Sequence, residues 1–421
     1  MKGCAGSFQI LGLALILCFS FSAYANYNSI LIGDQAAGMG GAATAMTEDA
    51  SAVAWYNPAA AAKLEGQSFS AAVGIYKKYD IRYRDDGDFS KASLRVNQGF
   101  FRALPSSTGS VIRAPNSDLL RDWTFVFSIL VPEYETFKGD IAKEGDSLST
   151  FAMTTESIWV GGGVARRIGA SDSVGVTIYY TARSLSKSVN DRTYVNATQS
   201  QIFTEERNMT QNAVVMLLGY HRDLSENWKW GLSARLPSLS VAGEAELTRT
   251  SIVNGAIQTP VSERALPAPA RNPWKISSGV AYTVKGNWSA AFDLNTYGPL
   301  RYGDIENTSY AERIEHQPIW NASFGFEKIW AEWFRTRVGI FTNFSPHPNP
   351  KTAEVQGQGD HVDQGGFSAN LALKSGNIEY TFGGYYTGGR GRSVQRINQN
   401  YEVVPKVVNV FTMLVGTSYS F

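Results

Sequence analysis

The sequence predicts an all-β fold: a 14-stranded antiparallel transmembrane β-barrel plugged by a partly helical N-terminal hatch. Three observations lead to this prediction. The chain opens on a secretion signal, most of it alternates apolar and polar side chains, and one early tract rich in Ala and Gly does not alternate. We therefore expect a removed signal peptide at residues 1–25, a hatch at residues 26–66 and a barrel at residues 67–421.

The first segment has the three parts of a secretory signal peptide. Lys2 supplies the positive charge, residues 10–22 form a short apolar core, and Ala23-Tyr24-Ala25 is a small-residue cleavage site. The apolar core is too short for a membrane-spanning helix. The sequence thus predicts export, with Asn26 as the first residue of the mature chain.

Composition limits the function classes of the mature chain. Both cysteines, Cys4 and Cys18, fall in the signal, so no disulfide, thiol nucleophile or Cys-based zinc site is expected. Without Lys2 the chain has 37 basic and 37 acidic residues, which argues against a nucleic-acid partner. No later stretch approaches the roughly 18 apolar residues of a spanning helix. Two classes remain, a soluble β-rich periplasmic protein and an outer-membrane barrel.

The last strand favours the barrel. In residues 408–421, Phe411 and Met413 share one face with Tyr419 and Phe421, while the other face carries the small or polar residues Thr412, Gly416, Ser418 and Ser420 together with Val410 and Leu414. A chain that ends on an aromatic residue, with another aromatic two positions earlier, resembles the assembly signal of bacterial outer-membrane barrels. We therefore predict that Tyr419 and Phe421 form this signal, which the barrel-assembly machinery reads.

The same alternation recurs along the chain. In residues 288–298, Phe292 and Leu294 alternate with Asp293 and Asn295. Strands of this kind, about ten residues long, suit a wall between lipid and lumen. They must close into a ring, because an open edge in hydrocarbon leaves backbone groups unpaired. We predict strands at 67–84, 92–102, 123–136, 150–167, 172–187, 210–222, 228–245, 266–284, 288–298, 316–328, 333–344, 364–373, 378–389 and 407–421.

The connections between these strands predict the orientation. Short polar turns, near 222–228, 284–288 and 373–378, are expected to face the periplasm, and the longer loops to face outside. The connection at 103–121 breaks this rule because it is long on the periplasmic side. It is either a small appendage or part of a miscounted strand.

The tract at residues 33–64 is expected to fill the lumen. Residues 42–46 and 50–55 favour short helices, Asp49 suits a helix start, and Asn57-Pro58 forces a turn. The glycines do not form a phosphate loop, because no Gly-Lys-Ser/Thr follows and no strand precedes them. Close packing of small residues in a confined space explains them.

Several motifs give the chain a family resemblance. The hatch resembles that of the FadL-type long-chain fatty acid transporters, and the wall resembles the late strands of that family. The matching hatch motifs are Gly38-Met39-Gly40-Gly41-Ala42, Glu48-Asp49-Ala50-Ser51-Ala52 and Tyr56-Asn57-Pro58-Ala59-Ala60, and a wall motif is Asn272-Pro273-Trp274-Lys275. The residues that we assign to the hatch on this basis are Gly38, Gly40, Gly41, Asp49, Asn57, Pro58 and Ala59.

This resemblance implies transport of long-chain fatty acids or similar apolar compounds, with lateral exit at a kink in the third strand. Pro132 is the lateral-gap candidate, since proline cannot complete a ladder hydrogen bond; a strand that ends at Leu130 is the alternative. For a carboxylate, the family uses basic side chains around the pocket. Lys187 matches best and shares the inward parity of Tyr179, although a solvated lysine near a loop is the alternative. Gln317 stands where a second basic residue is expected, which leaves room for uncharged cargo.

The resulting expectation is a monomer in the bacterial outer membrane, surrounded by lipid, with a hydrophobic small molecule as its partner. We expect no cofactor and no enzymatic activity, and the four histidines lack the spacing of a metal site. An alternative function is a secretion-associated or partner-docking barrel, since such barrels share a similar Gly-rich and Asn-Pro-Ala opening. A general porin is disfavoured, because the plug would block an open channel.

Overall fold

The computed structural model describes most of the chain after the predicted signal. The described residues are 26–27, 29–46, 49–64, 66–83, 94–113, 120, 122–142, 147–196, 199–350, 359–397 and 400–421. The predicted signal peptide, residues 1–25, lies outside them.

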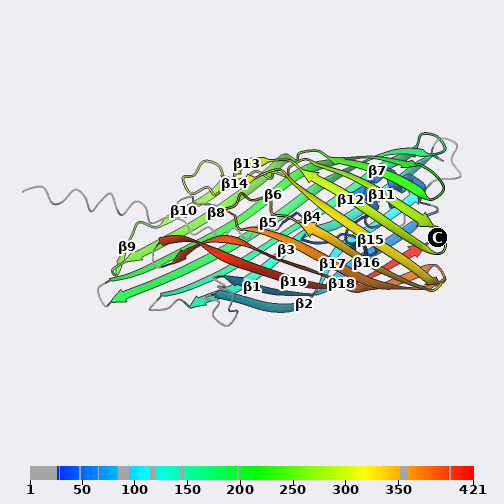
Figure 1. Cartoon of the computed structure of the whole chain (residues 1–421). Helices are drawn as coiled ribbons and strands as arrows, with labels where there is room; N and C mark the ends of the chain where they lie inside the picture. The colour runs from blue at the N-terminus through cyan, green and yellow to red at the C-terminus, as the bar shows by residue number, and fades with distance from the viewer. Residues whose placement is uncertain are drawn as a thin grey trace, which may run out of the picture.

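The wall is a closed barrel of tilted antiparallel strands (Figure 1). It has 14 wall positions, two of which hold a pair of segments in line, β7 followed by β8 and β10 followed by β11. β1 pairs with both β2 and β19, which closes the ring. The wall strands are β1 (Ser68–Tyr83), β2 (Leu94–Arg113), β3 (Trp123–Ala142), β4 (Ser147–Arg167), β5 (Asp172–Asn196), β6 (Gln199–Asp223), β7 (Trp228–Arg235), β8 (Leu239–Val253), β10 (Val261–Pro267), β11 (Lys275–Val284), β12 (Trp288–Tyr297), β15 (Ile319–Ala331), β16 (Phe334–Asn343), β17 (His361–Ser375), β18 (Ile378–Ile397) and β19 (Asn400–Ser420).

Three short strands lie outside this count. β9 (Ala256–Ile257) extends the tip of the β8 hairpin. β13 (Leu300–Gly303) and β14 (Arg313–His316) form a separate two-stranded sheet between β12 and β15.

The predicted number and order of wall strands are confirmed, but one connection was wrong. Residues 103–113 belong to β2; within this stretch, residues 104–105 and 107–111 pair with β1, and residues 107–113 pair with β3. Residues 103–113 are therefore neither an appendage nor an extra strand: they lengthen the predicted strand 92–102, and the number of strands does not change. Their Ser-, Gly- and Pro-rich composition is that of a loop, yet residues 107–111 have strand neighbours on both sides, which satisfy their backbone groups.

Side chains on the wall follow the predicted parity. Phe292 and Leu294 are exposed on the outer face, whereas Asp293 and Asn295 are buried in the lumen. Phe411 and Met413 on β19 are exposed in the same way. The outer surface thus carries the apolar belt that a transmembrane barrel presents to lipid. No helix among the described residues has the length and apolarity needed to cross a membrane.

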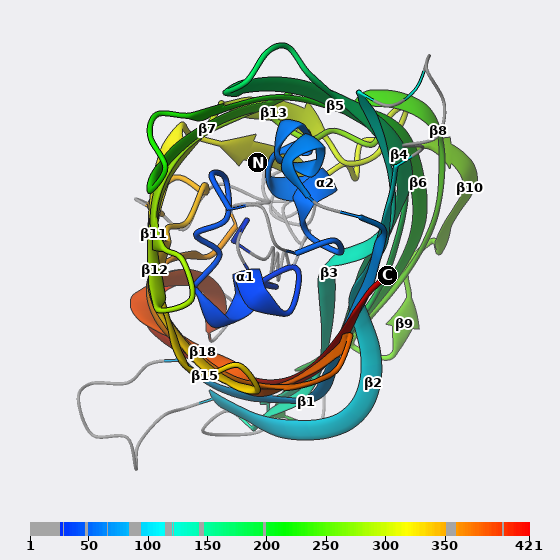
Figure 2. The ribbon, with the colours of Figure 1, turned by 90° about the vertical axis from the view of Figure 1, so that its right-hand side faces the viewer.

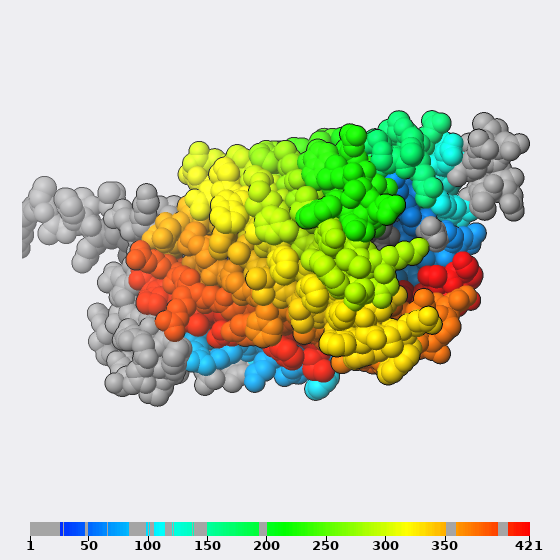
Figure 3. All heavy atoms as spheres, turned by 45° about the vertical axis from the view of Figure 1, so that its right-hand side comes forward, coloured from blue at the N-terminus to red at the C-terminus, as the bar shows by residue number. Residues whose placement is uncertain are grey.

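The hatch lies inside the ring of strands (Figure 2). Its helices are α1 (Gln35–Gly38), α2 (Val53–Tyr56) and the 3-10 helix η1 (Pro58–Lys63), and the segment before α1 with Ile30 and Leu31 also belongs to it. Its atoms are visible at the end of the barrel where the C-terminal strand finishes (Figure 3). Residues 42–46, predicted to be helical, form turns instead.

The glycine tract turns the chain sharply after α1. Gly40 and Gly41 have φ angles of +68° and +81°, a region that side chains with a Cβ rarely adopt. Asp49 does not cap α2, whose N-cap residue is Ala52. Its carboxylate instead accepts hydrogen bonds from the Ser51 amide (3.0 Å) and hydroxyl (2.8 Å), which closes the turn before α2.

Inward glycines of the wall let the hatch backbone approach closely. A Cβ on Gly175 of β5 would lie 2.6 Å from the Pro58 carbonyl carbon, and one on Gly109 of β2 would lie 2.6 Å from the Ala50 oxygen. One on Gly416 of β19 would lie 2.5 Å from the Asp34 Cβ. The hatch therefore seats on the wall through backbone contacts that an alanine would prevent.

We expect Gly175→Ala to loosen the hatch. The added methyl group overpacks the contact with η1 and should lower the free energy of unfolding by about 1–3 kcal/mol, measured by urea titration of the purified barrel. Gly365→Ala on β17 is the matched control, because its Cβ meets nothing within 4 Å. Equal stability of the two variants would contradict the seating.

Candidate functional site

Asp293 of β12 is the strongest polar anchor between wall and hatch. Its Oδ2 accepts hydrogen bonds from the amides of Ala43 and Thr44, both at 2.8 Å, and from the Thr44 hydroxyl at 2.7 Å. The Asp293 side chain is fully buried. One carboxylate oxygen therefore holds the turn that follows the glycine tract.

The second half of the hatch is anchored through Asn57. Its side-chain amide donates to the carbonyl oxygens of Thr44 (2.9 Å) and Tyr220 (3.0 Å), and its Oδ1 accepts from the Ala59 amide at 3.1 Å. Ser173 of β5 donates to the Ala59 oxygen at 2.9 Å. Pro58 follows this junction as the first residue of η1. Asn57, Pro58 and Ala59 thus join the two hatch halves to the wall.

The glycine tract is held by β17. Gly40 donates its amide to the Ser368 hydroxyl, which in turn donates to the Gly38 oxygen, both at 2.9 Å. Asn370 donates to the Asp34 oxygen at 2.8 Å. Four of the predicted hatch residues, Gly38, Gly40, Asn57 and Ala59, thus form hydrogen bonds with the wall.

A cavity of about 150 Å³ lies between the hatch and the upper wall. Aromatic side chains from both parts surround it. The Trp55 ring of the hatch contacts Trp159 of β4 edge-on at 5.1 Å, and Tyr27 stacks on Tyr297 of β12 at 4.5 Å. Ile30 and Leu31 of the hatch complete the apolar side of this lining. The cavity can hold an apolar group.

The opposite side of this cavity is positively charged. Arg235, Arg271 and Lys275 line it, and none of the three makes an ion pair with the described residues. Arg235 is 8% exposed, and its guanidinium lies about 6 Å from the ring centres of Trp55 and Trp159. Lys275 stands directly opposite Arg235 in the β7–β11 register. Two facing cations without a carboxylate favour an anion between them.

The remaining charges of the lining neutralise each other. Arg183 of β5 makes a bidentate pair with Glu133, at 2.9 and 3.0 Å. Four cations and one carboxylate line the cavity, so it carries a net charge of three positives with His316 neutral. Nothing in the sequence pattern groups these residues, because they come from β3, β5, β7 and the start of β11.

Lys187 points inward, as its parity predicts, but it has a protein partner. Its ammonium is 2.7 Å from a carboxylate oxygen of Glu312, and both side chains are buried. It does not line the 150 Å³ cavity. The side chains that present unpaired positive charge to the cavity are Arg235, Arg271 and Lys275 instead.

The wall is interrupted between β2 and β3. Their ladder runs from Arg113–Thr124 to Ser107–Leu130 and stops there. Beyond it, β3 pairs only with β4, after a bulge at Val131–Pro132. The strands meet again where the Lys138 amide donates to Gln98 Oε1 at 3.2 Å. Because β3 continues to Ala142, it does not end at Leu130. Pro132 lies in the bulge at which the β2–β3 ladder stops, and we call the unpaired stretch beyond this bulge the window.

A second, smaller cavity of about 30 Å³ lies at this window. Tyr76, Pro105, Val131 and Tyr134 line it from the wall side. Ile30 and Leu31 line it from the hatch side, and the same two residues line the first cavity. These two hatch side chains are therefore the partition between the aromatic cavity and the window.

The chain ends where the ring closes. Tyr419 pairs with Phe69 of β1, and its ring lies edge-on to Phe421 at 4.5 Å. Phe421 is 72% exposed at the end of the barrel that holds the hatch. Both aromatic rings are thus placed at one rim of the finished barrel.

The described residues contain no cluster of three or more metal-ligating His, Cys, Asp or Glu side chains. Two histidines nevertheless meet, since the rings of His316 and His347 are 4.7 Å apart. Tyr27 Oη lies 2.6 Å from His316 Nδ1, which ties the first described residues to the β13–β14 hairpin.

Comparison with solved structures identifies the fold. No family model and no curated protein matches the sequence. A Pseudomonas aeruginosa FadL homologue superposes with a TM-score of 0.71, at 13% identity over 94% of this chain and 100% of that chain. The Pseudomonas putida toluene transporter TodX gives 0.64, at 13% identity over 94% and 100%. The monoaromatic hydrocarbon channel CymD gives 0.62, at 14% identity over 94% and 99%. At these identities the likeness shows the fold, which is the FadL-type barrel.

We expect Asp293→Ala to release the hatch. The variant loses three hydrogen bonds to a buried carboxylate, each worth about 1.5–3 kcal/mol, so the plug should admit polar solutes. The measurement is the rate at which vesicles with the reconstituted barrel take up a small sugar. Ser289→Ala, a buried inward position on the same strand, is the control. No increase over this control would contradict the anchoring role.

Proposed function

We propose that this chain, with its FadL-type fold, transports hydrophobic molecules across the bacterial outer membrane. The observation that carries the proposal is the contiguity of cavity and window. Ile30 and Leu31 separate an aromatic cavity in the lumen from a break in the wall. A movement of this hatch segment would join the two cavities, and an apolar solute could then leave sideways into lipid without crossing water.

The window suits such an exit because most side chains that line its cavity are apolar or aromatic, with Lys77 as the charged exception, and because its backbone is unusual for a barrel. Lipid offers no hydrogen bonds, so a barrel normally pairs every strand edge. Here the β2–β3 ladder is absent beyond Leu130 of β3, and the Lys138 amide contacts β2 only through the Gln98 side chain. Phe101 is 83% exposed beside it, with its ring 4.7 Å from Tyr76. We propose that Pro132 maintains this break, since its nitrogen cannot donate to a partner strand.

The charge of the cavity favours an amphiphilic cargo with an anionic headgroup, such as a long-chain fatty acid. Arg235 and Lys275 would hold the carboxylate, and Trp55 and Trp159 would hold the alkyl chain. A neutral hydrocarbon would leave the buried guanidinium of Arg235 without a counter-ion, which is costly where water is excluded. The solved structures with this fold include a FadL homologue and toluene transporters. In this chain the cationic lining favours a charged amphiphile over a neutral hydrocarbon such as toluene.

The location and assembly of the protein are part of the same proposal. The apolar outer belt suits outer-membrane lipid, and Tyr419 with Phe421 would serve as the signal for the barrel-assembly machinery. We propose a monomer, since one chain closes the ring. A barrel that only docks partner proteins requires neither an aromatic cavity nor a window, and we therefore prefer transport.

We expect a covalent bridge across the window to block transport. Ser106→Cys with Val131→Cys places the bridge just beyond the last ladder pair, Ser107–Leu130, as a disulfide or a short bismaleimide. Cells with the bridged protein should lose uptake of labelled laurate, and a reductant should restore it for the disulfide.

The control bridge joins Thr108→Cys to Ile129→Cys, which already face each other in the ladder. It should leave uptake unchanged. Normal uptake through the bridged window would refute lateral exit at this site.

We expect Arg235→Gln to weaken binding of laurate by roughly 10- to 100-fold, the loss of one charged hydrogen bond. Binding of decane should stay within about twofold, because the aromatic lining is unchanged. Isothermal titration in a nonionic detergent measures both. Arg166→Gln, an exposed outward arginine of β4, is the control. An equal loss for laurate and decane would contradict a headgroup role.

A further inference from the structure

The segment 300–316, which we call the lid, covers the cavity at the end of the barrel away from the short turns. It contains β13, β14 and their loop, and it belongs to no wall strand. Tyr302 and Ile314 line the cavity from above. The loop reaches across to the wall, where Ile305 packs against Leu185 of β5 and Met209 of β6. The lid therefore covers the cavity and packs against wall strands that are distant from it in sequence.

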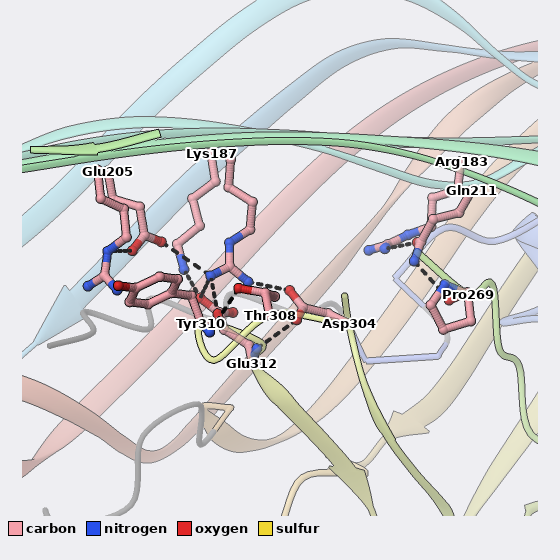
Figure 4. Close-up of polar contacts among 11 residues, drawn as sticks. Arg183, Lys187, Glu205, Gln211, Pro269, Asp304, Thr308, Tyr310 and Glu312 are labelled. Carbon is pink, nitrogen blue, oxygen red and sulfur yellow. Dashed lines mark hydrogen bonds and ion pairs between the residues drawn. The ribbon is translucent and has the colours of Figure 1, made fainter. Parts of the chain in front are cut away.

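Buried ion pairs join the lid to the wall (Figure 4). Lys187 of β5 lies 2.7 Å from Glu312 of the lid, and Arg207 of β6 pairs with Asp304. Arg207 also donates to the Tyr310 oxygen at 2.9 Å. These four charged side chains are between 1% and 7% exposed. Together they form a latch.

The charges of the latch balance only while the lid is closed. The wall contributes three cations, Lys187, Arg207 and Arg249, and one carboxylate, Glu205. The lid contributes two carboxylates, Asp304 and Glu312. The closed cluster is neutral, whereas the wall alone has two positive charges in excess. Uncompensated charge in such a site is unfavourable, so the lid opens readily only when other anions replace its carboxylates.

Arg249 of β8 offers hydrogen-bond donors to which an anion can bind. The residue is 3% exposed, and its guanidinium lies between the rings of Phe203 (5.1 Å) and Tyr310 (4.5 Å). Its Nε is 3.1 Å from Glu205, yet none of its three nitrogens makes a hydrogen bond within the described part of the chain. These donors can bind a headgroup that carries several oxygens.

We propose that the lid is the outer gate of the cavity, and that Lys187, Arg207 and Arg249 form an anion-binding site whose occupation opens it. The carboxylate of an amphiphile takes the place of Glu312 on Lys187, and the released lid gives access to the cavity below. A ligand shifts such an equilibrium only through its higher affinity for the open state. An uncharged hydrocarbon has no such preference for a cationic patch. The inference rests on the proposed transport of anionic amphiphiles.

The test reports lid position without relying on transport. The chain has no cysteine after Cys18, so Ile305→Cys gives a single thiol in the mature chain, buried between the lid and the wall. The rate of its reaction with a bulky, membrane-impermeant maleimide measures opening in the purified full-length barrel. We expect laurate to raise this rate by about tenfold or more, and dodecanol, with the same chain length and no charge, to leave it unchanged.

Substitutions in the latch provide a second test of the proposal. Glu312→Gln should raise the labelling rate without any ligand by at least about tenfold, because it removes a charge partner of Lys187. Glu312→Asp, which keeps the carboxylate, should stay protected. Glu315→Gln is the matched control, since this carboxylate lies on the exposed face of the same hairpin. Resistance of the folded barrel to SDS identifies any variant that has not folded.

Two results would overturn the inference: equal labelling rates with laurate and dodecanol, or a Glu312→Gln variant that is as protected as Glu315→Gln. Each of these results can be told apart from a failure of the proposed function. If the cavity does not bind anionic cargo, laurate affinity becomes independent of Arg235 while Glu312→Gln still opens the lid. If the latch is wrong, laurate binds through Arg235 and Ile305→Cys stays protected.

Discussion

A barrel in lipid has to pair the edges of its strands, and this chain departs from that constraint between β2 and β3. The ring of 14 strands is closed, yet the β2–β3 ladder stops at Leu130 although β3 continues to Ala142. An unpaired backbone segment facing hydrocarbon is unfavourable by several kcal/mol for each orphaned group. Its presence beside a cavity therefore calls for a function, and lateral release of an apolar solute is the one that the surrounding Tyr76, Val131 and Tyr134 support.

The interior is organised by two contrasting arrangements of charge. In the aromatic cavity, Arg235 and Lys275 make no ion pair with a carboxylate among the described residues. In the latch above it, Lys187 and Arg207 are matched by Glu312 and Asp304. Unpaired cations attract a charged ligand, whereas paired ones hold an element in place until an anion competes. The same type of headgroup can thus open the lid and then bind beneath it.

The wall and the plug could be predicted from the sequence because both depend on local patterns. Alternation with period two locates strands, and the small residues around Gly40 locate the hatch. Composition misled for residues 103–113, where a polar, Gly-containing tract is nonetheless a strand. The cavity and the latch could not be predicted, because they depend on strand register and on contacts between distant residues. Lys187 finds its partner Glu312 at a sequence separation of 125, and no local signal marks that pair.

The central claim is a continuous route from the aromatic cavity past Ile30 and Leu31 to the window. A crystal structure with a fatty acid brominated at its terminal carbon tests it most directly, since the anomalous signal locates the bromine. The account predicts the carboxylate at Arg235 and bromine density toward Leu31, with further density in the β2–β3 window. Bromine density found only on the outer belt of the barrel, with an empty cavity, would contradict it.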